Sequence, residues 1–261
     1  MSRRSSGGNP LTRPEEEGNY LASLSDMMSG LLFIFIITLI VFVINFNMER
    51  IEAAEQKQEL TEKYDELTDA RKTRAEMLTS LERSLKMKGV EVSIDKDHGL
   101  LHIPEGILFD SGSAALPPEG GRTLDIIAEQ LSTLLPCYSG KADAPAPDEC
   151  RDNYKPGRLE AVFVEGHTDN VPMPPRGGIQ DNWDLSTKRA VTTYRHLLGH
   201  APTLAAFVNL DGDPLFGVSG YAASRPRNPH DTPTPDAQNR RIDLRFLLAA
   251  PRGQEQDKAT P

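Results

Sequence analysis

The sequence predicts a membrane-anchored α/β protein in three parts: a single N-terminal transmembrane helix, a helical or coiled-coil spacer, and an α/β sandwich domain. Three observations lead to this prediction. Residues 27–46 carry no charge, residues 49–88 contain no proline or glycine, and strand-like and helix-like patterns alternate from residue 90 onward. The expected parts are a disordered tail (1–19), the transmembrane helix (20–47), the spacer (48–88), the sandwich domain (89–250) and a flexible tail (251–261).

The apolar segment is long enough to cross a bilayer, which takes about 20 residues as a helix. A helix also satisfies its own backbone hydrogen bonds in lipid. One carboxylate, Asp26, lies where this segment begins. Because a charge on such a helix is costly, we interpret Asp26 as an ion or proton site; a helix N-cap or a snorkelling residue is the structural alternative. The segment ends in the polar and bulky residues 45–49, which favours a retained anchor over a cleaved signal peptide.

Composition excludes several classes of protein. The chain has 261 residues and a formal net charge of −9, without a basic stripe, which argues against nucleic acid as the main partner. It has no second long apolar run, which argues against a multi-span membrane protein. Cys137 and Cys150 lie in a proline-rich segment without the spacing of a metal site. If this segment is exported, a disulfide is expected; two free thiols are the alternative.

The spacer has the composition of a helix. With Tyr64 at heptad position a, most a and d positions hold leucine, but Arg71 and Arg74 interrupt the seam. A weak parallel coiled coil and a solvated single helix both fit this pattern. About 40 helical residues extend roughly 60 Å, so either structure would hold the next domain away from the membrane.

The remaining elements follow from hydrophobic periodicity and turn residues. Strands are expected at 90–94, 100–103, 159–166, 216–221 and 241–248, and helices at 117–135, 185–198 and 201–210. Asp184 or Ser186 is the expected N-cap of the second helix. Residues 141–156 form a proline-rich insertion. This alternation of β and α units predicts an α/β or α+β sandwich.

Four ordered motifs then resemble the OmpA-like peptidoglycan-binding domain. They are FDSGSA (109–114), GHTDN (166–170), NWDLSTKRA (182–190) and NRRIDL (239–244). The resemblance covers about residues 90–250. It implies that Asp169 and Arg189 hold the diaminopimelate of the peptidoglycan stem peptide. It also implies that Thr168, Asn182 and Leu185 line the same pocket and that Arg240 closes the last motif.

The chemistry agrees with these roles. Diaminopimelate offers a carboxylate, which an arginine binds bidentately, and an ammonium, which an aspartate binds. The alternative for Asp169 and Arg189 is a structural salt bridge with each other. His167 has no partner cluster in the sequence, so neither a catalytic nor a metal role is expected for it. Trp183 is expected to pack beside the pocket.

The combination of membrane helix, spacer and domain is similar to the B subunit of ion-driven rotary stators, the MotB type. The segment around Asp26, the charged helix and the cysteine-bearing insertion resemble more closely ZorB, the motor subunit of the Zorya anti-phage defence system. This resemblance implies a homodimer inside five A-type subunits, MotA-like or ZorA-like. It also implies a single-pass inner-membrane protein with a cytoplasmic N-terminus and a periplasmic domain.

In such a motor Asp26 would carry H⁺, with Na⁺ as the alternative, and no cofactor or enzymatic activity is expected. Three other functions remain open. A flagellar stator shares the same parts, and a passive tether between membrane and cell wall would explain the anchor and the domain without Asp26. An enzyme acting on peptidoglycan is the third, but the sequence shows no nucleophile–base pair, metal-ligand set or paired carboxylates that would support it.

Overall fold

The computed structural model describes residues 15–140, 148, 150 and 154–249. The expected C-terminal tail, residues 1–14 of the expected N-terminal tail and most of the insertion lie outside these residues. The chain divides into two compact units, Met1–Glu62 and Lys63–Pro261. One helix, α1 (Glu15–Met87), runs through both. The predicted fold class is confirmed, because a long N-terminal apolar helix and a helical region are followed by an α/β sheet domain.

The first unit contains the apolar part of α1. It is the one helix among the described residues that is long and apolar enough to cross a membrane, judged by length and composition. Its large side chains are exposed all around the helix, with 64% of Phe33 and 66% of Phe42 accessible. A helix that is apolar all round needs lipid or other protein around it. Asp26 lies on an exposed turn of the same helix.

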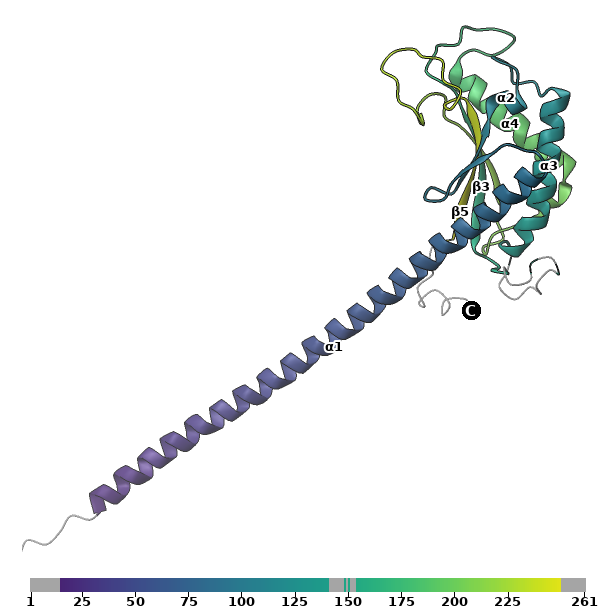
Figure 1. Cartoon of the computed structure of the whole chain (residues 1–261). Coiled ribbons are helices and arrows are strands. Elements are labelled where there is room, and N and C mark those ends of the chain that lie inside the picture. Colours follow the sequence, from purple (N-terminus) through teal and green to yellow (C-terminus); the bar gives the residue numbers. More distant parts are fainter. Residues whose placement is uncertain (1–14, 141–147, 149, 151–153, 250–261) are drawn as a thin grey trace, which may run out of the picture. The chain divides into compact units, whose positions relative to one another are not determined.

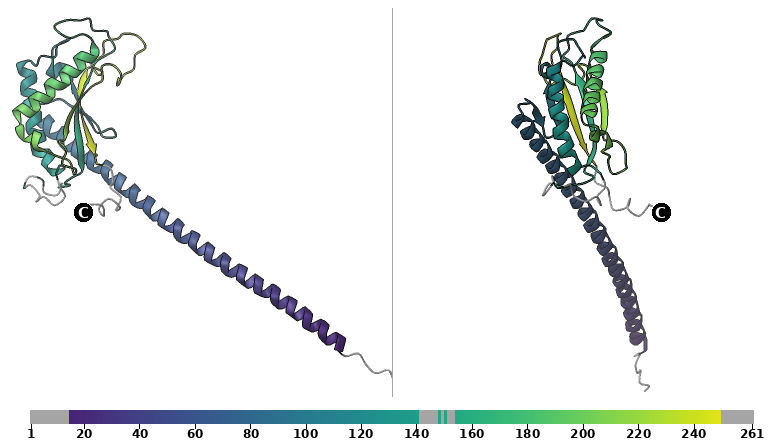
Figure 2. Two further views of the ribbon diagram at one scale, coloured as in Figure 1. Left: turned by 180° about the vertical axis from the view of Figure 1, so that it is seen from behind. Right: turned by 90° about the vertical axis from the view of Figure 1, so that its right-hand side faces the viewer.

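The second unit is a two-layer α/β domain. Its sheet has the order β1-β2-β5-β3-β4, in which β3 and β4 are parallel and the other neighbours antiparallel. The strands are β1 (Ser93–Asp95), β2 (Leu100–Pro104), β3 (Leu159–His167), β4 (Phe216–Gly220) and β5 (Arg241–Leu248). The helices are α2 (Glu105–Leu108), α3 (Pro118–Leu134) and α4 (Asn182–His200), with 3₁₀ turns η1 (Leu135–Cys137) and η3 (Pro202–Ala206). Figures 1 and 2 show α3 and α4 against the same side of the sheet.

The crossover from β3 through α4 to β4 brings the helix unusually close to the sheet. A Cβ atom at Gly166 would fall on the backbone carbonyl of Ser186, and one at Gly220 would overlap Thr187. Glycine is therefore required at both strand positions, because any side chain would push α4 outward. This close packing fixes the distance between α4 and the sheet. Helix α4 carries several residues of the candidate site.

The last turns of α1 belong to the domain and not to a spacer. Met77, Leu78, Leu81 and Leu85 are fully or almost fully buried in the same core as α3 and the sheet. The heptad interpretation is thus corrected for this part, since leucines assigned to a coiled-coil seam pack on their own domain. By contrast, the seam residues nearer the membrane segment are exposed, with 71% of Tyr64 accessible.

Most expected elements of the domain lie where they were predicted, but α2 was not predicted and three further details differ. The N-cap of α4 is Asp181, whose carboxylate accepts the backbone N–H of Asp184 at 2.8 Å. The expected helix at 201–210 is a short 3₁₀ helix, Pro202–Ala206, and the first strand is Ser93–Asp95 where 90–94 was expected. Cys137 and Cys150 form a disulfide, with their Cα atoms 5.3 Å apart.

Candidate functional site

A cavity of about 400 Å³ lies where β3 ends and α4 begins. All four sequence motifs contribute to it, since Ser111 and Gly112 of the first motif line the cavity together with residues of the other three. The six residues expected at a ligand site all line it: Thr168, Asp169, Asn182, Leu185, Arg189 and Arg240. The fold therefore brings together positions as far apart in sequence as 111 and 240.

Asp169 follows the end of β3 and is almost buried. Its Oδ2 accepts a hydrogen bond from Arg240 Nη1 at 2.6 Å. The backbone N–H of Asp236 donates to the same oxygen at 3.3 Å, and that of Val171 donates to Oδ1 at 3.3 Å. The carboxylate is thus held in place by one short charged contact and two long backbone contacts.

Arg189 lies in the middle of α4, with only 2% of its surface accessible. Its Nη2 donates to Glu105 Oε1 at 2.7 Å, and its Nε donates to the backbone carbonyl of Ser113 at 2.7 Å. The guanidinium also lies 5.4 Å from the centre of the Phe109 ring. Arg189 and Asp169 therefore have separate partners, so the alternative of a salt bridge between these two is not what the structure shows.

Glu105 is the residue of this site that the sequence analysis missed. It begins α2, is buried, and lies between the two arginines: Oε1 bonds Arg189, and Oε2 is 3.3 Å from Arg240 Nε. The second contact has the distance of an ion pair without hydrogen-bond geometry, and Oε2 makes no hydrogen bond among the described residues. The only sequence signal was a lone carboxylate between Pro104 and Gly106, directly after a strand.

The charges of the pocket alternate. Two carboxylates, on Glu105 and Asp169, interleave with two guanidinium groups, on Arg189 and Arg240, so the formal charges of the four cancel. A neutral set of alternating charges suits a ligand that carries both a cation and an anion. It does not favour a simple anion or a simple cation, because either would leave one pair of groups unmatched.

The other expected residues shape the pocket. Asn182, at the first position of α4, donates to the backbone carbonyl of Val171 at 2.9 Å and so fixes the loop after β3. Thr168 donates to the carbonyl of Asp169 at 2.9 Å. Leu185 is buried and provides an apolar wall.

The loop before β5 contributes Pro235 to the lining of the pocket, and the next residue, Asp236, organises this loop. A hydrogen bond from His230, followed by others from Asn228 and the backbone of Gln238, lowers the pKa of the Asp236 carboxyl to about 2. The ionised side chain therefore organises the loop whose backbone also contacts Asp169.

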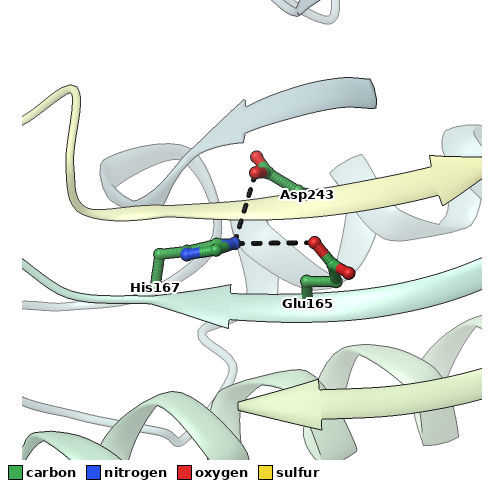
Figure 3. Close-up of side chains that lie close together, drawn as sticks. All are labelled: Glu165, His167 and Asp243. Atoms are coloured by element: carbon green, nitrogen blue, oxygen red, sulfur yellow. Dashed lines mark ion pairs between the residues drawn. The ribbon is translucent and has the colours of Figure 1, made fainter. Parts of the chain in front are cut away.

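A second polar cluster, outside the pocket, gathers around His167. Its Nε2 points between two buried carboxylates (Figure 3), 3.3 Å from Asp243 Oδ2 and 3.9 Å from Glu165 Oε2. Such a set could ligate a metal ion. However, Arg241 donates to both oxygens of Asp243, and Arg245 donates to both oxygens of Glu165. A divalent cation would face two guanidinium groups there, so we interpret the cluster as an ion network that supports β3 and β5.

The electrostatics of Asp243 agree with this interpretation. Burial alone would raise its pKa, but a 2.7 Å hydrogen bond from His102, the neighbouring His167 and the charge of Arg241 outweigh burial. The pKa of Asp243 consequently lies well below its ordinary value. Its alternation with core residues along β5 places this network on the sheet face opposite to the helices.

Trp183 differs from its expected packing role. It lies in the first turn of α4 beside the pocket, yet 54% of its surface is accessible. Asp26, the expected ion site, lies in the first unit, and its role stays a prediction.

Comparisons with protein-family models and with curated proteins find no match. Solved structures similar to this chain include a MotB-like protein from Desulfovibrio vulgaris, at 21% identity over 72% of this chain and 99% of that one, with a TM-score of 0.47. The cell wall anchor of the T6SS from Pseudomonas aeruginosa aligns at 22% identity over 65% and 96%, with a TM-score of 0.44. The periplasmic domain of Helicobacter pylori MotB aligns at 19% identity over 61% and 80%, with a TM-score of 0.39.

Proposed function

We propose that this protein is the peptidoglycan-anchored B subunit of an ion-driven rotary membrane motor, and that its pocket holds the diaminopimelate of a stem peptide. The observation that carries the proposal is the convergence of four sequence motifs on one cavity with alternating charges. The membrane-length uncharged segment of α1 (27–46), with the carboxylate of Asp26 directly before it, supports the motor part of the proposal.

In the proposed complex, the carboxylate of Asp169 binds the ammonium group of the diamino acid. The ligand carboxylate pairs with the arginines. Arg189 uses Nε and Nη2 for protein contacts, so its Nη1 remains as a donor, and Arg240 presents a third of its side chain to solvent. Glu105 holds both guanidinium groups in position. The neutral charge balance of the pocket then matches the zwitterionic ligand.

A cell-wall binding assay tests the assignment of the pocket to the diamino acid. Full-length protein in detergent would be sedimented with purified peptidoglycan sacculi, with free diaminopimelate as competitor. Asp169→Asn removes the partner of the ammonium group, and we expect at least about tenfold weaker binding, since a charge-assisted hydrogen bond contributes about 1.5–3 kcal/mol. Glu91→Gln is the matched control, because Glu91 is exposed and does not line the pocket. Equal binding by Asp169→Asn and the control would contradict the pocket assignment.

The motor part of the proposal assigns ion transfer to Asp26. Its carboxylate would alternate between a protonated and a free state as ions cross, and each charge moving through 100 mV releases about 2.3 kcal/mol. Rotation of an A-type ring around a B dimer needs a fixed dimer, and the grip on the wall supplies it. We expect Asp26→Asn to keep assembly and wall binding but to abolish ion-driven activity. Full activity of this variant would refute the ion-site assignment.

A passive tether is the competing function. Co-purification distinguishes the tether from the motor. A motor requires a partner protein with several membrane spans, at about five partner chains to two chains of this protein, and a tether does not. Replacing Na⁺ in the medium while measuring activity distinguishes H⁺ from Na⁺.

The role in anti-phage defence rests on the resemblance of the membrane segment, the charged helix and the insertion to ZorB. Cells carrying the protein and its gene neighbours would be challenged with phage, using Asp26→Asn as the inactive control. Protection that depends on Asp26 supports defence. A swimming defect on deletion without loss of protection supports the flagellar alternative.

A further inference from the structure

Trp183 forms the wall of a second cavity that adjoins the pocket. This cavity has a volume of about 480 Å³ and shares Pro172, Met173 and Asn182 with the first one. Trp183, Asp181 and Ser224 line its remaining surface, among others. A ligand that fills the pocket and extends across the shared residues therefore enters the second cavity directly.

The exposure of Trp183 is not explained by packing. Within the described part of the chain, its indole makes no hydrogen bond and no ring contact, although its backbone carbonyl accepts bonds from Ser186 and Thr187. It stands on the first turn of α4, which is capped by Asp181 and packed tightly on the sheet. An exposed aromatic ring on a helix whose backbone is firmly packed is typical of a binding surface.

We propose that Trp183 is a stacking platform for an N-acetylated sugar of the glycan strand. This inference rests on the proposed function, because it takes the stem peptide in the first pocket as its starting point. In peptidoglycan, an alanine and a γ-linked glutamate join the diamino acid to the sugar, so a short flexible chain connects a diamino acid in the first pocket with the sugar. A stem that crosses the residues shared by the two cavities would bring its sugar to Trp183.

The chemistry of the second cavity fits a sugar better than other occupants. Asp181 supplies the only formal charge among its lining residues. The sugar that bears the stem is itself uncharged, because its carboxyl group is consumed in the bond to the peptide. The flat apolar face of an indole accepts the C–H face of a pyranose ring. One oxygen of Asp181 caps α4, so the other is available to a sugar hydroxyl. An anionic lipid surface would instead require basic residues, which this cavity lacks.

The chain offers a direct probe, because Trp183 is its only tryptophan. Intrinsic fluorescence of the full-length protein in detergent would be followed during titration with two ligands. One is a disaccharide-tripeptide released from sacculi, and the other is the same tripeptide without sugars. We expect the disaccharide-tripeptide to shift the emission and to bind more tightly than the tripeptide.

Calorimetry on variants of Trp183 then measures how much its ring contributes to the binding affinity. Trp183→Ala should weaken binding of the disaccharide-tripeptide roughly tenfold, to the level of the tripeptide, and leave the tripeptide affinity unchanged, whereas Trp183→Phe should retain most of the difference. The unchanged tripeptide affinity also shows that the variant is folded.

Three outcomes would overturn the inference. If both ligands bind the wild type equally and Trp183→Ala has no effect, the sugar platform is refuted while the proposed function stands. If neither ligand binds, the proposed function fails and the platform fails with it. If the emission responds to anionic vesicles or to protein concentration and not to the disaccharide-tripeptide, the cavity serves a membrane or a second copy instead.

Discussion

The guanidinium of Arg240 bonds the carboxylate of Asp169 across 71 positions of sequence, with Nη1 2.6 Å from Oδ2. This contact ties the start of β5 to the end of β3 at the mouth of the pocket. In the proposed complex, a ligand ammonium group would share Asp169 with Arg240, and a ligand carboxylate would pair with the exposed part of Arg240. The contact between Arg240 and Asp169 thus holds both side chains at the positions that the proposed zwitterionic ligand requires.

The strength of this pair can be measured by a double-mutant cycle. We expect Arg240→Gln and Asp169→Asn each to lower the free energy of unfolding by about 1 kcal/mol, and the double variant to lose about 1 kcal/mol less than their sum. The estimate is modest because Arg240 is partly exposed to solvent. Urea unfolding of the detergent-solubilised chain measures it. Strict additivity would show that the two residues do not interact energetically.

Glu105 should contribute more to the free energy of unfolding than the Asp169–Arg240 pair does, because Glu105 is buried between two arginines. Glu105→Gln leaves the buried Arg189 without its charged partner, and we expect the free energy of unfolding to fall by about 3 kcal/mol. Glu119→Gln, on the exposed start of α3, is the control and should change stability by less than about 0.5 kcal/mol. Thermal unfolding of both variants checks the prediction, and equal melting temperatures would contradict it.

The close approach of α4 to the sheet predicts opposite effects for two glycines. Gly166→Ala would force its Cβ into the backbone of Ser186, so we expect a loss of about 3 kcal/mol or more and weaker ligand binding, because α4 carries Arg189. Gly199→Ala, near the exposed end of the same helix, meets no atom within 4 Å and should stabilise the protein by about 0.5–1 kcal/mol. Unfolding curves of the two variants should therefore shift in opposite directions.

The lowered pKa of Asp236 predicts that the stability of the folded protein depends on pH. Its folded pKa, about 2, lies below the ordinary value of 3.8. The ionised form consequently stabilises the folded state above about pH 4, and this contribution is lost as the pH falls towards 2. Melting temperatures of the wild type and Asp236→Asn should differ at pH 5 and converge between pH 4 and 2. A difference that stays constant over this range would be the contrary result.

Periodicity and turn residues predicted most of the elements, because these signals are local. The six pocket residues followed instead from the resemblance of four short motifs to a known domain. The sequence could not reveal Glu105, whose burial depends on Arg189 and Arg240, 84 and 135 positions away. It misassigned the leucines at the end of α1 because a coiled-coil seam and a domain-packed helix have the same spacing. It expected Trp183 to pack, since an apolar residue at a helix start gives no sign of which way the ring faces.

The disulfide between Cys137 and Cys150 has a consequence for determining how the chain is oriented in the membrane. Such a bond persists in oxidising compartments and is reduced in the cytosol. Rapid acid quenching of cells, alkylation of free thiols with a heavy maleimide and gel electrophoresis would therefore report on which side of the membrane the domain lies. These are the only two cysteines of the chain, so a band without added mass places the domain outside the cytosol, and a band that gains two labels places it inside.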